Sequence, residues 1–186
     1  MTFWFFTLGV PLFLYGLFSV AFPARAARAL VAFPRCREAG WILCAIGWFW
    51  TAHELDVIGI EIFDRYLKAF PGELWILAAV LTPLTCWWMP NLLPLRGLAA
   101  VFMLFPASLF PAVRLCDTPW RLVPVAAAYV CAATGMFGMF YPWHWRRLLA
   151  WRAESAWRNV PFAAAYFLAG ALMLALGALA AFGKIG

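Results

Sequence analysis

Residues 160–182, VPFAAAYFLAGALMLALGALAAF, decide the fold. The stretch carries no charged residue and has the length of a helix that crosses a bilayer, for which about 20 mostly apolar residues are needed. Similar apolar stretches alternate with clusters of charged residues along the chain. Because backbone groups in lipid must be satisfied within their own segment, each stretch predicts a membrane-spanning helix. The predicted spans cover residues 2–22, 39–57, 74–93, 97–113, 122–141 and 160–182.

The overall composition agrees with spans that lie in lipid. Of the 186 residues, 67% are apolar and only 12% are charged. A soluble fold of this size would expose much of that apolar surface as aggregating patches. We therefore expect an all-α integral membrane protein, with residues 1–186 forming a single transmembrane domain of six helices. The same order of helices can be described as three tandem hairpins.

The charged connections predict the orientation of the chain, because lysine and arginine favour the cytoplasmic side. Arginines concentrate in the first, third and fifth connections: Arg25, Arg28, Arg35, Arg37, Arg96, Arg146, Arg147, Arg152 and Arg158. Carboxylates concentrate in the second connection and at its edges: Glu54, Asp56, Glu61, Asp64 and Glu73. We expect the odd connections in the cytoplasm and both termini outside. The absence of an organelle transit peptide favours a bacterial inner membrane.

Two connections are predicted to form helices that lie on the membrane surface. In residues 57–70 the polar side chains recur at helical spacing opposite an apolar face, which is typical of an interfacial helix. Residues 143–158 combine four tryptophans with four arginines. Tryptophan prefers the headgroup zone, and arginine is attracted to an anionic inner leaflet. Membrane lipids are therefore expected partners, and nucleic acid is not.

A repeated pattern links two parts of the chain. Gly16 and Pro23 have the same spacing as Gly135 and Pro142, and a basic segment follows each pair. We expect either an internal duplication or a chance match favoured by membrane composition. The pattern resembles that of many small bacterial inner-membrane proteins, and this resemblance implies no activity.

The strongest candidate for chemistry is the polar group His53, Glu54 and Asp56. A span that begins near Arg37 reaches its outer edge near Val57, since a helix rises about 1.5 Å per residue. Ionisable groups at such an edge face protein or water, and they can relay protons or bind an ion. The alternative is a shorter span whose polar end rests in the interface.

A second candidate is a lipid phosphate contact made by His144, Arg146, Arg147 and Arg152. Guanidinium groups match phosphate in geometry and in charge. The alternative is that these residues only set the orientation of the chain.

Two further features are predicted to shape the helices. Ala163, Gly170 and Gly177 recur every seven residues, which indicates a stripe for close helix packing, within the chain or toward a partner. Prolines inside spans either kink the helix or line a substrate site: Pro83, Pro106, Pro111 and Pro124.

No motif for catalysis, nucleotide binding or haem ligation occurs, so we expect no cofactor and no bound metal. Three classes of function remain. The first is a non-catalytic subunit or scaffold of a membrane assembly, with a membrane-protein partner or a second copy of the chain. The second is a small transporter, substrate-binding membrane component or channel, and the third is an enzyme acting on lipid headgroups.

Overall fold

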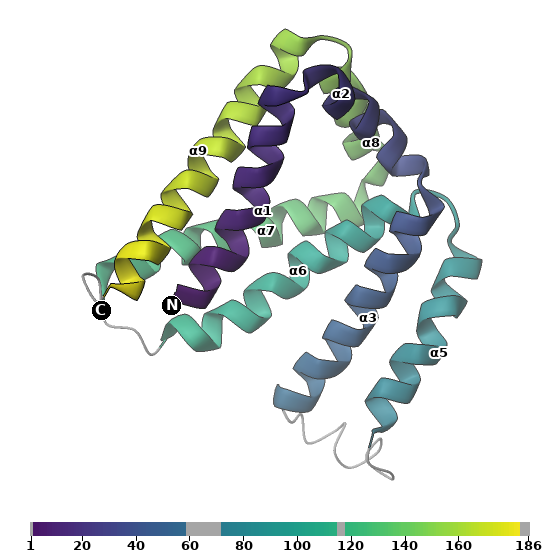
Figure 1. Cartoon of the computed structure of the whole chain (residues 1–186). Helices are drawn as coiled ribbons and strands as arrows, with labels where there is room; N and C mark the ends of the chain where they lie inside the picture. The colour runs from purple at the N-terminus through teal and green to yellow at the C-terminus, as the bar shows by residue number, and fades with distance from the viewer. Residues whose placement is uncertain (1, 59–71, 115–117, 183–186) are drawn as a thin grey trace. The chain divides into compact units, whose positions relative to one another are not determined.

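A computed structural model describes residues 2–58, 72–114 and 118–182, and within these ranges the chain is helical and has no strand (Figure 1). The predicted surface helix at 57–70 lies almost wholly outside the described residues. The α-helices are α1 (Thr2–Ala21), α2 (Pro23–Ala32), α3 (Arg37–Ile58), α5 (Glu73–Trp88), α6 (Leu93–Arg114), α7 (Leu122–Phe140), α8 (Pro142–Ala153) and α9 (Ala156–Ala181). Two short 3-10 helices are η1 (Phe33–Arg35) and η2 (Pro119–Arg121).

Four segments are long and apolar enough to cross a membrane: Thr2–Ala21, Leu93–Arg114, Pro119–Phe140 and Trp157–Ala181. They correspond to α1, α6, η2 with α7, and most of α9. The remaining two predicted spans differ from these. Helix α5 has 16 residues and so extends only about 24 Å, and α3 carries charged residues near both ends. The prediction of an all-helical membrane protein is thus supported by four helices.

Helix boundaries differ from the prediction where proline or local polarity intervenes. Helix α5 ends at Trp88 instead of residue 93, because the residue before Pro90 is disfavoured in the helical region. Met89 accordingly has a φ of −123° and a ψ of 60°. The predicted surface helix 143–158 is interrupted, because Ser155 is extended and α9 starts directly after it.

Helix α2 occupies a segment that was predicted as a connection. Pro23 suits the first position of a helix, because its missing N–H needs no partner there. Ala26 and Leu30 are buried one turn apart, whereas Arg25 and Arg28 are exposed. The segment is therefore a short amphipathic helix. Hydropathy did not predict it, because it is shorter and more basic than a membrane span.

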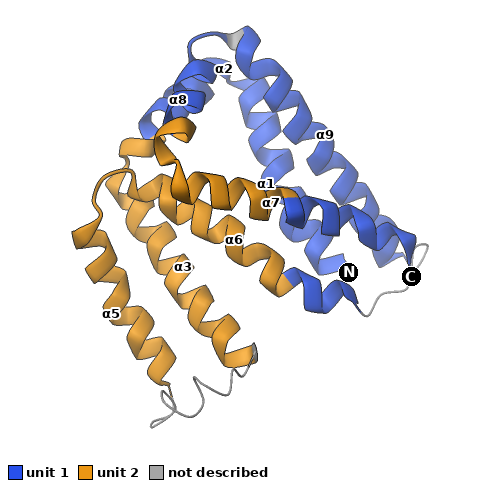
Figure 2. Cartoon of the chain, turned by 180° about the vertical axis from the view of Figure 1, so that it is seen from behind, with its two compact units in different colours: residues 1–32, 109–129, 146–186 blue, residues 33–108, 130–145 orange. Residues whose placement is uncertain are grey.

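The chain divides into two compact units, residues 1–32, 109–129 and 146–186, and residues 33–108 and 130–145 (Figure 2). In the first unit α1 and α9 lie side by side and run antiparallel (Figure 1). A Cβ atom added at Gly16 would lie 2.5 Å from the Phe167 backbone nitrogen, and one added at Gly9 would lie 3.1 Å from that of Leu174. Only glycine allows so close an approach of two helix backbones.

The predicted stripe of small residues on α9 packs against this same helix. A Cβ atom at Gly170 would collide with the Phe13 backbone, and one at Gly177 would lie 3.0 Å from Phe5 Cβ. The rings of Phe13 and Phe167 pack against each other, with centroids 4.8 Å apart. The glycines of this stripe therefore pack against α1 of the same chain.

In the second unit α3 packs against two helices. It runs antiparallel to α5, since Cys44 clusters with Cys86 and Ala52 clusters with Leu74. It runs parallel to α6: a Cβ atom at Gly40 would lie 3.2 Å from Leu93 Cβ, and one at Gly97 would lie 2.7 Å from Leu43 Cβ.

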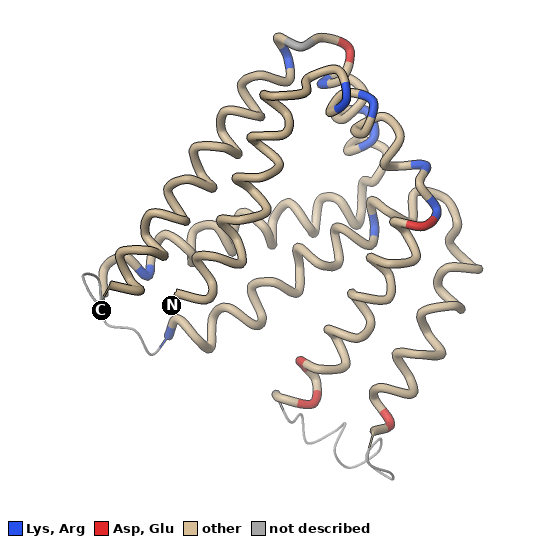
Figure 3. Tube along the Cα trace, in the orientation of Figure 1, with Lys and Arg blue, Asp and Glu red and all other residues tan. Residues whose placement is uncertain are grey.

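Charge is distributed unevenly within each unit (Figure 3). In the second unit Glu54, Asp56 and Glu73 lie where α3 ends and α5 begins, and Arg37 and Arg96 lie where α3 and α6 begin. In the first unit arginines gather on α2, on α8 and at the start of α9, with a smaller group at the opposite end: Arg25, Arg28, Arg146, Arg147, Arg152, Arg158, Arg114 and Arg121.

Both copies of the repeated pattern have the same local structure. Pro23 begins α2 directly after α1, and Pro142 begins α8 directly after α7. Gly16 packs on the backbone of α9, and a Cβ atom at Gly135 would lie 2.7 Å from a backbone oxygen of α6. A duplication stays a prediction, but the shared pattern corresponds to a shared structure.

Candidate functional site

The second unit contains a polar cluster between α3 and α6. The Trp50 indole Nε1 donates to Glu54 Oε1 at 3.0 Å and to Ser108 Oγ at 2.8 Å, and the Ser108 hydroxyl donates to the same carboxylate. Trp50 and Glu54 are one helical turn apart on α3, whereas Ser108 comes from α6. The cluster therefore holds a half-buried carboxylate against a neighbouring helix.

This cluster contains only one of the three residues predicted to form the ion or proton site. His53 is exposed on another side of α3, with its ring 6.5 Å from that of Trp75 in α5. Asp56 is also exposed. The three residues are close in sequence, but successive residues on a helix point in directions about 100° apart.

Trp50 and Ser108 are site residues that the sequence analysis did not identify. Ser108 is a single hydroxyl in an apolar span, and 54 positions separate it from Glu54. The only signal was that Trp50 precedes Glu54 by one turn, which places both on one face. Chemically, a carboxylate that accepts two hydrogen bonds can hold or release a proton, or contribute one ligand to a cation.

A second polar cluster surrounds Arg152 in the first unit. Arg152 lies in the last turn of α8 and is only 4% exposed. Its Nη2 donates to the Asn159 side-chain oxygen at 2.9 Å and to the Tyr15 hydroxyl at 3.4 Å. The guanidinium lies over Phe162 and Tyr166, with Cζ 4.3 and 5.6 Å from the ring centroids. The sequence predicted Arg152 on the membrane surface, and the structure buries it between α1 and α9.

Neutral partners offset the cost of burying the Arg152 charge. Removing an ion from water costs several kcal/mol even after relaxation. A cation over an aromatic ring recovers about 0.5–2 kcal/mol, and a hydrogen bond from a charged donor about 1.5–3 kcal/mol. Every partner of Arg152 among the described residues is neutral, and its Nε is buried with no hydrogen-bond partner there.

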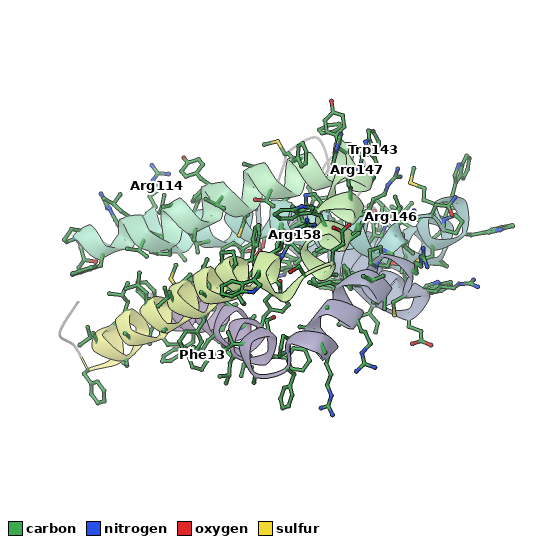
Figure 4. The ribbon with its side chains drawn as sticks, turned by 90° about the horizontal axis from the view of Figure 1, so that it is seen from above. Phe13, Arg114, Trp143, Arg146, Arg147 and Arg158 are labelled. Atoms are coloured by element: carbon green, nitrogen blue, oxygen red, sulfur yellow. The ribbon has the colours of Figure 1, made fainter. Side chains whose placement is uncertain are left out.

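The other predicted phosphate-contact residues lie on the outside of α8. His144, Arg146 and Arg147 are all exposed, and the two arginines are labelled in Figure 4. The His144 ring lies 6.0 Å from the Phe137 ring and 5.9 Å from the Tyr141 ring, as part of an aromatic group. Their contact with lipid phosphate stays a prediction, as does an enzyme acting on lipid headgroups.

Comparison with known proteins adds no family to this description. No family model, no curated protein and no solved structure matches the chain. Within the described ranges no three His, Cys, Asp or Glu side chains gather as metal ligands would. The features of the chain that bear on function are therefore the two polar clusters and the arrangement of the helices.

Proposed function

We propose that the chain is a non-catalytic multi-pass membrane protein, a subunit or scaffold of a membrane assembly, that crosses the membrane six times with both termini outside. The proposed location is a bacterial inner membrane, with anionic lipids on the cytoplasmic side. The proposed protein partner is either another membrane protein or a second copy of this chain.

The directions of packed helices support six alternating spans. Consecutive spans must alternate in direction, so the second and third are antiparallel and the second and fourth are parallel. These are the relations of α3 to α5 and of α3 to α6, and α1 and α9 are antiparallel as a first and a sixth span would be. The short α5 requires a locally thinner bilayer, which costs a fraction of a kcal/mol per Å of mismatch.

Exposed apolar side chains support placement in lipid. Along α5 the large side chains Ile76, Val80 and Trp87 are 64%, 57% and 85% exposed. Similar residues are exposed on α1 and on α9, including Leu14 and Leu168. Exposed apolar faces on several helices would aggregate in water and are stable in hydrocarbon.

One observation supports a structural role: hydrogen bonds between polar side chains join pairs of the described helices. Trp48 Nε1 donates to Thr85 Oγ1 at 3.0 Å, which joins α3 to α5. Glu54 and Ser108 join α3 to α6, and Arg152 ties the end of α8 to Asn159 at the start of α9. Such hydrogen bonds stabilise the packing of a helix bundle, whereas catalysis requires polar groups that face a substrate.

The test is purification of the full chain in mild detergent, followed by gel filtration, chemical cross-linking and mass spectrometry. We expect a complex of fixed composition, formed with one membrane protein or with further copies of the chain. An unrelated membrane protein of similar size, carrying the same tag, is the control for detergent-induced association. A monomer that catalyses a reaction or transports a solute would contradict the proposal.

The Trp50, Glu54 and Ser108 cluster favours one second candidate, a small transporter, substrate-binding membrane component or channel. A carboxylate held between two spans is a typical place for a moving proton or cation. Proton flux into liposomes that contain the purified chain tests this candidate. Glu54→Gln should abolish flux, whereas Glu38→Gln, at the other end of α3, should leave it unchanged. Wild-type liposomes as tight as empty ones would reject the candidate.

A further inference from the structure

A tyrosine hydroxyl lies at the middle of one apolar span and has no partner in the described part of the chain. The segment Pro119–Phe140 is long and apolar enough to cross a membrane, and Tyr129 lies near its centre, about 15 Å from either end. Tyr129 is 64% exposed. Among residues 2–58, 72–114 and 118–182, none forms a hydrogen bond with its hydroxyl.

Lipid does not satisfy this hydroxyl. The Tyr129 ring packs against Phe110 of α6, with centroids 5.3 Å apart, and a tyrosine side chain is too short to reach the headgroups from this depth. The hydrocarbon core offers no hydrogen-bond partner, so a hydroxyl exposed there is destabilised. The hydroxyl is therefore stabilised most by a protein that presents a hydrogen-bonding group at the middle of the bilayer.

The face of α7 around Tyr129 suits close contact with another helix. Ala126 and Ala133, three residues before and four residues after Tyr129, are exposed on the same face. Small side chains at these positions let two helix backbones approach closely in lipid. Another face of α7 is used within the chain, where a Cβ atom at Gly135 would meet the backbone of α6.

We propose that two copies of the chain pair through this face of α7, with Tyr129 against Tyr129 of the second copy. A phenol hydroxyl both donates and accepts a hydrogen bond, so it is satisfied by a copy of itself. A two-fold dimer brings identical residues together at its axis, and the alanines on either side allow the hydroxyls to meet. This inference rests on the proposed function and names a second copy as the partner.

The experiment measures association of the full chain in phosphatidylglycerol and phosphatidylethanolamine liposomes. Copies labelled at the amino terminus with a donor or an acceptor fluorophore are mixed, and energy transfer is followed as the protein is diluted with lipid. Transfer from the labelled chain to an unrelated labelled membrane protein of similar size measures random proximity. We expect transfer between copies that exceeds this background and falls on dilution, which gives a dissociation constant.

One pair of variants tests the hydroxyl. Tyr129→Phe keeps the ring and its contact with Phe110, and it should raise the dissociation constant about threefold to twentyfold, the range for hydrogen bonds between membrane helices. Tyr141→Phe is the matched control, because Tyr141 is an exposed tyrosine just beyond the end of α7, where water reaches it. This control should associate like the wild type.

A second pair of variants tests the close approach of the helices. Ala133→Leu places a large side chain on the proposed interface and should raise the dissociation constant about tenfold or more. Ala169→Leu is the control, since Ala169 is an exposed alanine on α9. Both alanines are exposed, so neither change disturbs the packing of a single chain. Circular dichroism checks that every variant keeps its helical content.

The proposal is overturned if wild-type transfer does not exceed random proximity, or if Tyr129→Phe or Ala133→Leu associates as strongly as the wild type. Association that survives both changes places the interface elsewhere and leaves the role in an assembly intact. A fixed complex with a different membrane protein, without transfer between copies, also rejects pairing through α7 but not the assembly. A monomer in this test and in the purification rejects both.

Discussion

Thr85 shows how a single polar residue joins two helices in the second unit. Its hydroxyl accepts from Trp48 Nε1 at 3.0 Å and donates to the Leu81 backbone oxygen at 2.7 Å. The indole N–H would be left without an acceptor if the hydroxyl were removed. Inside a helix bundle the loss of this acceptor lowers the stability of the fold, because no water replaces it.

We predict that Thr85→Val lowers the free energy of unfolding by about 0.5–1.5 kcal/mol. Unfolding by sodium dodecyl sulfate, followed by tryptophan fluorescence, measures the change. Thr134→Val is the control, because the Thr134 hydroxyl donates only to Val130 within its own helix. Equal effects of the two substitutions would show that the bond between α3 and α5 contributes nothing.

At the scale of elements, the antiparallel pair of α1 and α9 depends on glycines that allow the backbones to touch. A Cβ atom at Gly170 would collide with the Phe13 backbone nitrogen and Cα. Neither helix can move away without losing the contacts of Phe5, Met173 and Leu176, which form a buried cluster between them.

Gly170→Ala should therefore destabilise the chain by about 1–3 kcal/mol, the usual cost of overpacking. The control is Gly47→Ala, because a Cβ atom there would lie 3.6 Å from Ala100 Cβ, an ordinary contact. Alanine also favours a helix over glycine by up to about 1 kcal/mol, so this control should be neutral or stabilising. Detergent unfolding distinguishes them, and a neutral Gly170→Ala would mean that the two helices separate readily.

For the whole molecule, the orientation of the charged ends in the membrane is the largest prediction. Within the second unit Arg37 and Arg96 lie where α3 and α6 begin, whereas Glu54, Asp56 and Glu73 lie where α3 ends and α5 begins. If the start of α3 is cytoplasmic, residues near its end face the outside.

A cysteine introduced by Val57→Cys should react with a membrane-impermeant maleimide added to intact cells, because Val57 is 67% exposed at the end of α3. Arg28→Cys, exposed on α2, should react only after the cells are opened. The wild-type chain, with its own free cysteines, measures background labelling. The reverse pattern would invert the topology and place the carboxylates inside.

Helix positions were predictable from the sequence, because crossing a bilayer demands about 20 apolar residues and charge marks where each span ends. Span 122–141 agrees with α7, and span 2–22 agrees with α1. Helix α2 and the end of α5 at Trp88 depended on local effects of proline and amphipathicity that hydropathy does not register.

The polar clusters could not be predicted in the same way, because their members are far apart in sequence. The sequence alone established an apolar helical chain, the asymmetry of its arginines and the small residues on α9. Tertiary packing decided that Glu54 meets Ser108 while His53 turns toward Trp75, and that Arg152 is buried beside Asn159 and Tyr15. Hydrophobic periodicity indicates which residues are removed from water. Which polar groups meet depends instead on how the helix backbones approach one another, and contacts between residues distant in sequence determine that approach.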